Sequence, residues 1–270
     1  MVTGAAGFIG AAVGGELKAL GARFVGVTRR DIVGMTRVES YTDAPTGDVL
    51  VHLAEDNNRS RVAERGESYE HEVVTATAAL LRKGFRRVVY VSSAALYSDR
   101  YETARRPGDA VHVVDAYTRV KRSCETLVLD SDAGVVVRPS NVYGLGMSSQ
   151  NVVSTMLARV AEPGPLVVRD TAPVRDFVWI ADAAAGIARV ALGETRGIFN
   201  VGSGVATSIM DLAKMTLGIY GQPDREVRSS ACASDRSSLV LDVSLTEQTF
   251  GYRPVVSLRE GLTNLITSRQ

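Results

Sequence analysis

The 270-residue sequence predicts an α/β fold, in which a doubly wound parallel sheet is followed by a smaller C-terminal lobe. Two observations predict it. Short runs of branched apolar residues alternate with stretches of helical periodicity, which is typical of βαβ units. A glycine-rich turn also separates the first of these strands from the first helix. The hydrophobic fraction of 45% is large enough to bury a full core.

The elements follow one another in a regular order. The first strand is confined to residues 1–3, and apolar residues then recur at helical spacing from Ile9 to Leu20, with Gly21 at the expected end of that helix. Further strands are predicted at 23–28, 48–53, 87–92 and 134–138, and further helices at 73–82 and 116–129. The pattern loosens after residue 140, which predicts a sheet domain at 1–140 with a returning segment near 175–202, and a lobe made of 141–174 and 203–270.

Charge and cysteine content exclude several classes of protein. The 31 Lys and Arg against 30 Asp and Glu give a net charge of +1, so no overall field favours nucleic acid or an anionic membrane. The two cysteines are too few for a disulfide framework, and the three histidines lack the spacing of metal ligands. We therefore expect a cytoplasmic protein that holds no metal and binds neither nucleic acid nor membrane.

The stretch TGAAGFIG, residues 3–10, places three glycines three apart between the first strand and the first helix. In a Rossmann-type turn the first glycine permits the tight bend, the second lets backbone approach a pyrophosphate, and the third lets the helix pack on the strand. Plain close packing is the alternative interpretation of such small residues. The expected dinucleotide contacts are Gly4, Gly7, Phe8, Ile9 and Gly10.

The end of the second strand bears on the choice of dinucleotide, because an acidic residue there holds the ribose 2′-hydroxyl and an arginine accommodates a 2′-phosphate. The stretch VGVTRRD puts Thr28, Arg29 and Arg30 at this point. A guanidinium forks onto phosphate and keeps its charge, so NADP is predicted. Asp31 could serve a ribose hydroxyl instead, and the two arginines could be solvated loop residues, so NAD stays open as the alternative.

Polar residues on two segments predict a catalytic group. Ser92 and Ser93 end a predicted strand, whose carboxyl end lies at the cofactor crevice of such a sheet, and a serine hydroxyl there can donate a hydrogen bond to a carbonyl. Tyr117 and Lys121 lie four apart and therefore on one helical face, a spacing that is also common in exposed pairs. An ordinary tyrosine has a pKa of about 10, and a nearby ammonium brings its proton into use near neutrality. We expect Tyr117 to move a hydroxyl proton while a nicotinamide carries the hydride.

These motifs resemble those of the extended short-chain dehydrogenase/reductase family, the NAD(P)-dependent epimerase/dehydratase family that modifies nucleotide sugars. They run in family order: TGAAGFIG (3–10), DVLVHLAE (48–55), VYVSSAALY (89–97), YTRVK (117–121), VVRPSNVYGLG (136–146), VRDFVWIADAA (174–184), FNVGSG (199–204), LDVSLTEQTFGYRP (241–254) and SLREGL (257–262). The resemblance implies a dinucleotide-binding Rossmann domain, a substrate-binding lobe, and a homodimer formed through the helices at 73–82 and 116–129.

The resemblance also assigns residues. It implies that Ser93, Tyr117 and Lys121 form a catalytic triad. Further cofactor contacts are implied at Leu53, Ala54, Pro139, Ser140, Tyr117 and Lys121, and substrate contacts at Ser93, Asn141 and Arg175, with Arg236 as a substitute for an arginine that many relatives carry before Asp242.

The sequence departs from the family pattern in several places. No asparagine occurs between Asn58 and Asn141, although relatives often use one in a proton relay, and Val120 and Ser98 stand where serine and glycine are usual. Relatives also have a longer first strand. Either the strand is shortened here, or the native chain extends before Met1.

The residues after the catalytic serine bear on the reaction. The family's 4,6-dehydratases have an acid pair there, whereas this sequence has Ala94 and Ala95, so dehydration is not expected. The predicted function is NADP-dependent reduction of a 4-keto group on a nucleotide-activated sugar. The alternative is a nucleotide-sugar 4-epimerase with tightly bound NAD(P). A non-catalytic dinucleotide-binding subunit is a third interpretation, and the intact Ser93, Tyr117 and Lys121 argue against it.

Overall fold

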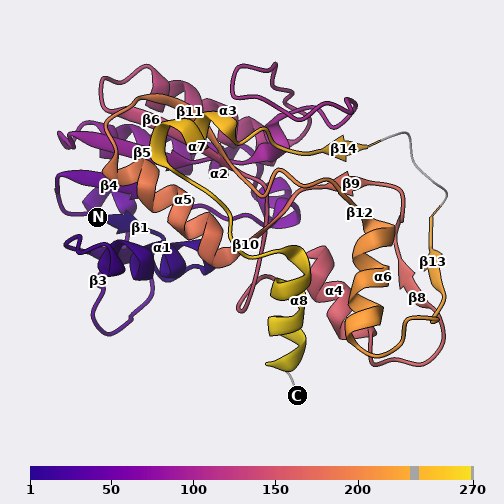
Figure 1. Ribbon diagram of the computed structural model, residues 1–270. Helices are drawn as coiled ribbons and strands as arrows, with labels where there is room; N and C mark the ends of the chain where they lie inside the picture. The colour runs from indigo at the N-terminus through magenta and orange to yellow at the C-terminus, as the bar shows by residue number, and fades with distance from the viewer. Residues whose placement is uncertain (232–236, 269–270) are drawn as a thin grey trace.

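Residues 1–231 and 237–268 are described by a computed structural model (Figure 1). Within these ranges the main sheet has seven parallel strands in the order β11-β6-β5-β4-β1-β2-β3. Their bounds are β1 (Val2–Thr3), β2 (Gly26–Thr28), β3 (Thr36–Arg37), β4 (Val49–His52), β5 (Arg87–Val91), β6 (Gly134–Pro139) and β11 (Gly197–Val201). The predicted doubly wound α/β fold is confirmed.

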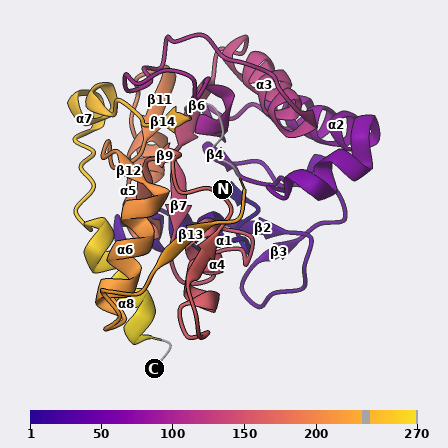
Figure 2. The same cartoon turned by 90° about the vertical axis from the view of Figure 1, so that its right-hand side faces the viewer.

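Helices cover both faces of this sheet (Figures 1 and 2). α1 (Phe8–Ala19) and α5 (Ile180–Leu192) pack with Val89 and Val91 of β5 in one hydrophobic cluster. α2 (Arg59–Leu81) and α3 (Ala116–Leu129) pack with Tyr90 in another. Successive side chains of a strand point to opposite faces, and burial on both faces explains why β5 is apolar almost throughout. Within the described ranges, no helix combines the length and apolar character needed to cross a bilayer.

Two predicted element boundaries are corrected by the structure. The helix predicted at 73–82 is only the second half of α2, which begins at Arg59 because the Asn58 side chain accepts a hydrogen bond from the Arg61 backbone amide (3.0 Å). Gly66, at φ 54°, interrupts the helical dihedrals within it, and the apolar periodicity starts only beyond that kink. The strand predicted at 23–28 is paired only over Gly26–Thr28.

The remaining elements include two 3-10 helices that connect strands of the main sheet, and the helices and strands that follow β6 (Figure 1). They are η1 (Tyr41–Asp43), η2 (Ala94–Leu96), β7 (Asn141–Tyr143), α4 (Val152–Arg159), β8 (Leu166–Val168), β9 (Val174–Arg175), β10 (Phe177–Trp179), β12 (Thr207–Ser208), α6 (Ile209–Ile219), β13 (Val227–Ser229), β14 (Ser238–Leu239), α7 (Ser244–Phe250) and α8 (Leu258–Thr267). Met156, Leu212 and Leu262 bring α4, α6 and α8 into one cluster. Phe250 and Tyr252, by contrast, pack with the sheet domain. The domain boundaries at 140, 175, 202 and 203 stay a prediction.

Two glycines of α1 give a matched test of its packing on the glycine turn. A Cβ on Gly10 would lie 2.2 Å from the Gly4 carbonyl oxygen, so Gly10→Ala should lower the free energy of unfolding by about 1–3 kcal/mol. A Cβ on Gly15 would meet no atom within 4 Å, so Gly15→Ala should raise it by about 0.5–1 kcal/mol. Urea denaturation measures both, and equal effects of the two substitutions would contradict this packing.

Candidate functional site

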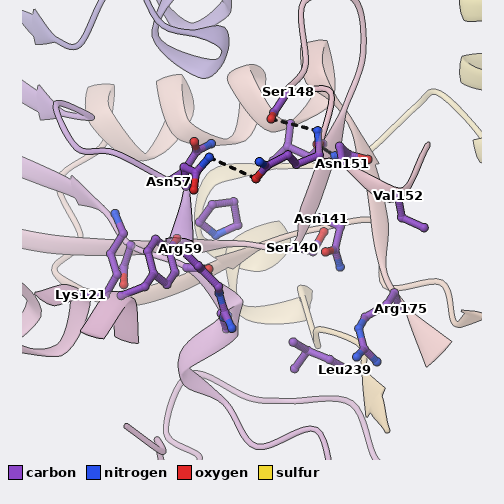
Figure 3. A pocket seen from close by; sticks show the side chains of 18 of the residues that line it. Asn57, Arg59, Lys121, Ser140, Asn141, Ser148, Asn151, Val152, Arg175 and Leu239 are labelled. Atoms are coloured by element: carbon purple, nitrogen blue, oxygen red, sulfur yellow. Dashed lines mark hydrogen bonds between the residues drawn. The ribbon is translucent and has the colours of Figure 1, made fainter. Parts of the chain in front are cut away.

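A cleft of about 1310 Å³ opens where the strands of the main sheet reach their carboxyl ends. It lies against the residues that follow β1, β4, β5 and β6, and the lobe supplies its other wall. In doubly wound sheets this edge is where ligands bind. Figure 3 shows Lys121 and Arg59 at one end of the view, with Asn141 and Arg175 toward the other. The fold thus brings residues far apart in sequence to one cavity.

The glycine turn forms one wall of the cleft. Gly4 has φ 67°, and a Cβ there would lie 2.7 Å from the Leu53 carbonyl oxygen, so only glycine suits the position. Gly7 is the N-cap of α1 and provides no side-chain cap, which leaves the first amides of the helix available to a ligand. Free amides at a helix N-terminus, next to a backbone stripped of side chains, fit the pyrophosphate of a dinucleotide. Phe8, Ile9 and Gly10 line the same wall.

The residues expected to select the cofactor lie beside this turn but outside the cleft lining, as does Ala54. Thr28 is buried, and its hydroxyl oxygen accepts a hydrogen bond from the Arg30 backbone amide (3.1 Å). The Arg30 guanidinium donates to the Ala6 carbonyl within the turn. Arg29 is 3.0 Å from Glu72 and lies over the ring of Tyr41, so its charge is already paired.

The three predicted catalytic residues all line the cleft. Ser93 ends the segment after β5, and its hydroxyl oxygen accepts a hydrogen bond from the Ala95 amide (3.1 Å). α3 starts just before Tyr117 because Asp115 and Thr118 form a capping box. The Lys121 ammonium lies 5.9 Å from the centre of the Tyr117 ring and donates to the Val91 carbonyl (2.9 Å). A hydroxyl, a phenol and a cation therefore share one cavity.

Two charged residues beside the triad were missed by the sequence analysis. The Glu55 carboxylate is 2.9 Å from the Lys121 ammonium, with both side chains more than nine-tenths buried. Burial acts to lower the pKa of Lys121, but the attraction of Glu55, together with the other groups around the ammonium, raises the pKa overall. Arg59, from the first turn of α2, places its guanidinium 5.2 Å from the centre of the Tyr117 ring and pairs with Asp115. An acidic residue within three positions of the end of a buried strand was the available signal for Glu55.

The substrate residues implied by the family lie on the lobe side. Asn141 and Arg175 line the cleft, next to Pro139 and Ser140. The Arg175 guanidinium donates to the Ser237 hydroxyl (2.7 Å) and lies 3.5 Å from Asp99. Burial lowers the pKa of Arg175. Arg236, the expected substitute arginine, lies outside the described residues.

A buried aspartate that sequence analysis also missed holds this side together. Asp176 is fully buried, and its carboxylate accepts hydrogen bonds from the Ser203 amide (2.8 Å), the Ser203 hydroxyl (2.7 Å) and the Ser140 hydroxyl (3.1 Å). The amides of Gly204 and Leu241 donate to its other oxygen. It therefore joins the end of β6 to two lobe segments. Among the described residues, no cluster of His, Cys, Asp and Glu is arranged to hold a metal ion.

Comparisons with known proteins agree with this geometry. The model of the NAD dependent epimerase/dehydratase family matches residues 1–202. The chain is 34% identical over 140 residues to dTDP-L-rhamnose 4-epimerase of Burkholderia thailandensis, which covers 49% of this chain. It spans 38 to 44% of the length of that epimerase and of two UDP-glucuronic acid decarboxylases of Arabidopsis thaliana.

Two further likenesses extend over most of the chain. It is 29% identical over 244 residues to dTDP-4-keto-6-deoxy-D-glucose reductase of Streptomyces niveus, covering 84% of this chain and 81% of that protein. The structure of MoeE5 in complex with UDP-glucose and NAD superposes with a TM-score of 0.84 at 26% identity, covering 99% of this chain and 98% of the other.

The histidine beneath the cleft gives a pH-dependent prediction. His52 is fully buried between Thr3 (2.7 Å) and Thr77 (3.2 Å), and burial lowers its pKa from 6.5 to about 4. Between these values the unfolded chain binds a proton that the folded chain does not. The stability contributed by neutral His52 is therefore complete above pH 6.5 and is lost as the pH falls toward 4, by about 3 kcal/mol in total.

His52→Gln should flatten the dependence of the unfolding free energy on pH within this window. His71→Gln, on the exposed side of α2, is the control and should leave the slope unchanged. Denaturant titrations at several pH values between 4 and 7 measure the slopes. If the unfolding free energy of His52→Gln depended on pH as steeply as that of the wild type, other groups would cause the loss of stability in acid.

Proposed function

The chain belongs to the NAD dependent epimerase/dehydratase family, as its motifs predict, and we propose that it reduces a 4-keto group on a nucleotide-activated sugar with NADPH. The observation that carries this proposal is one cleft lined by the glycine turn, by Ser93, Tyr117 and Lys121, and by the substrate-side residues. Ala94 and Ala95 follow the serine without an acid for elimination. The likeness to a 4-keto-6-deoxy sugar reductase over most of the chain gives further support.

The chemistry of reduction divides between cofactor and protein. A nicotinamide, held through its diphosphate by the glycine turn, supplies a hydride when bound. The Ser93 hydroxyl donates a hydrogen bond to the keto oxygen and orients the carbonyl. Tyr117 donates its phenolic proton to that oxygen as negative charge develops, so the C=O bond becomes a CH–OH group. The Lys121 ammonium stabilises the phenolate that is left.

The selection of NADPH is also a proposal. Arg30 reaches the backbone of the glycine turn, and Arg29 lies next to it at the carboxyl end of β2. A 2′-phosphate there would compete with Glu72 for the Arg29 guanidinium, and the phosphate carries more charge than one carboxylate. NAD is the alternative cofactor.

The substrate and the assembly complete the proposal. Asn141 and Arg175 are proposed to bind the diphosphate of the sugar nucleotide. The diphosphate would compete with Asp99 for the Arg175 guanidinium. We also propose a homodimer formed through α2 and α3, which pack against each other and present exposed polar residues such as Arg119 and Arg122 outward.

A 4-epimerase with tightly bound NAD(P) is the second candidate, because 140 aligned residues, 49% of the chain, are 34% identical to dTDP-L-rhamnose 4-epimerase. The two functions differ in their net reaction. A reductase consumes one NADPH for each keto sugar, whereas an epimerase interconverts two isomers without net change in the cofactor. A non-catalytic dinucleotide-binding subunit would do neither.

An absorbance assay with NADPH against a panel of dTDP- and UDP-linked 4-keto sugars tests the function. We expect oxidation of NADPH with one member, and Tyr117→Phe should lower kcat by about 100-fold or more because the proton donor is lost. NADPH binding, followed by fluorescence, should be retained. Tyr220→Phe, at the end of α6, is the control. Isomer conversion without NADPH oxidation would instead establish the epimerase, and full activity of Tyr117→Phe would exclude the mechanism.

Substitution of Arg29 tests the choice of cofactor. Arg29→Ala should weaken NADPH binding by roughly tenfold or more and leave NADH binding nearly unchanged, because only the 2′-phosphate needs the guanidinium. Arg23→Ala, in the exposed segment before the amino end of β2, should change neither affinity. Fluorescence titrations give the dissociation constants. Tighter binding of NADH than of NADPH by the wild type would contradict the assignment.

A further inference from the structure

At the cleft, the catalytic helix is joined to the carboxyl edge of the sheet by the buried ion pair of Lys121 and Glu55. Lys121 projects from α3, and Glu55 follows the end of β4, so the pair spans two elements that are distant in sequence. The two charged atoms are 2.9 Å apart, with the side chains 8% and 6% exposed. An ammonium has three hydrogens to donate. In the described structure one goes to Glu55 and one to the Val91 carbonyl, which leaves the third for the cleft.

The surroundings of this pair are polar but incompletely hydrogen-bonded. Within the described part of the chain, the second carboxylate oxygen of Glu55, the Tyr90 hydroxyl and the Ser92 hydroxyl are buried without hydrogen-bond partners. Both Glu55 and Ser92 line the cleft. Buried polar atoms are normally paired, so a carboxylate kept here with one oxygen unused is costly to the fold. Such a group is more readily explained by a role in the site than by stability.

We propose that Glu55 is a positioning residue for the reduction: its carboxylate holds Lys121 charged and fixed at the sheet edge, so that Lys121 can stabilise the phenolate that Tyr117 leaves after it donates its proton. The inference rests on the proposed function, because it gives Glu55 a part in that proton transfer. Glu55 acts through Lys121.

Glu55 supplies the negative charge among the groups that surround Lys121. These groups, from β4, α2, β5 and α3, are His52, Arg59, Tyr69, Tyr90, Tyr117 and Cys124. Burial lowers the pKa of His52 to about 4 and raises the pKa values of Tyr69 and Cys124 to about 12, so all three are neutral near pH 7. Arg59 is a cation whose charge is paired with Asp115 at 3.1 Å.

The sign of the effect follows from this arrangement. An anion favours the protonated form of each neighbouring group. Glu55 therefore helps Lys121 to stay an ammonium despite its burial. Reduction needs this ammonium beside the phenolate that Tyr117 leaves. Removal of the charge should therefore move the alkaline limit of the reaction in one direction only, toward lower pH.

Glu55→Gln tests this with a group of similar size and no charge. The alkaline limb of the kcat–pH profile for NADPH-dependent reduction should shift down by about 1 to 3 pH units. Glu55→Asp, which keeps the carboxylate, should restore most of the wild-type limb. The matched control is Glu70→Gln, which removes the carboxylate that pairs with Arg119 (2.7 Å) between α2 and α3, and it should leave the limb in place. An unchanged limb in Glu55→Gln overturns the proposal.

A second measurement needs neither substrate nor cofactor. In Glu55→Gln the buried Lys121 has lost its counter-charge, so burial lowers its pKa in the folded state below that of the unfolded chain. The folded protein then loses the proton first as pH rises, which relieves the destabilisation. The deficit in Tm relative to wild type should therefore be largest at pH 7 and should narrow by pH 9.5. Glu70→Gln should show a small deficit that does not change with pH.

The two measurements separate failure of the inference from failure of the proposed function. If no 4-keto sugar is reduced by the wild type but the Tm deficit narrows as expected, the ion pair has the stated electrostatics and the reductase assignment is wrong. If reduction occurs while the limb and the pH dependence of the Tm deficit are both unaffected by Glu55→Gln, the role of Glu55 is wrong and the reductase stands.

Discussion

The close approach of two backbones at Gly4 is the constraint on which the rest of the site depends. The carbonyl of Leu53, just after β4, lies where a side chain on Gly4 would be. The backbone of the glycine turn is therefore in direct contact with the backbone at the end of this strand. Because β1 pairs with both β2 and β4, this contact sets where α1 begins relative to the whole carboxyl edge of the sheet. The amides of the helix N-terminus and the strand ends then face one cleft.

Two buried carboxylates secure the other side of that edge. Asp176 accepts hydrogen bonds from Ser140, which follows β6, and from two lobe segments, and it is the neighbour of Arg175 in the chain. Glu125 of α3 pairs with Arg138 of β6 through two hydrogen bonds of 2.8 and 2.7 Å, with both side chains buried. Removal of one partner from such a pair leaves an unpaired buried charge, so these contacts define the geometry more than they add stability.

Charge in the cleft is arranged in pairs, which suits a site for proton donation. Lys121 is balanced by Glu55 and Arg59 by Asp115, so the two cations near the Tyr117 ring are both partly compensated. On the substrate side, Arg175 has Asp99 close by. A ligand with a phosphate group would replace the carboxylate partner of one of these cations. The free energy gained on binding is then the difference between a contact with phosphate and a contact with carboxylate, and not the full energy of the phosphate contact.

The sequence by itself determined the features that depend on neighbours along the chain. The glycine turn, the buried strands, the helix at 116–129 and the placement of Tyr117 and Lys121 on one face of it all follow from local spacing and periodicity. The resemblance of the sequence motifs to those of the family singles out Ser93. Only the tertiary structure decided which charges meet. Glu55 reaches Lys121, Asp176 reaches Ser203, and Arg29 reaches Glu72, each across many intervening residues. Ion pairs of this kind are set by how strands and helices stack, and no local pattern encodes that distance.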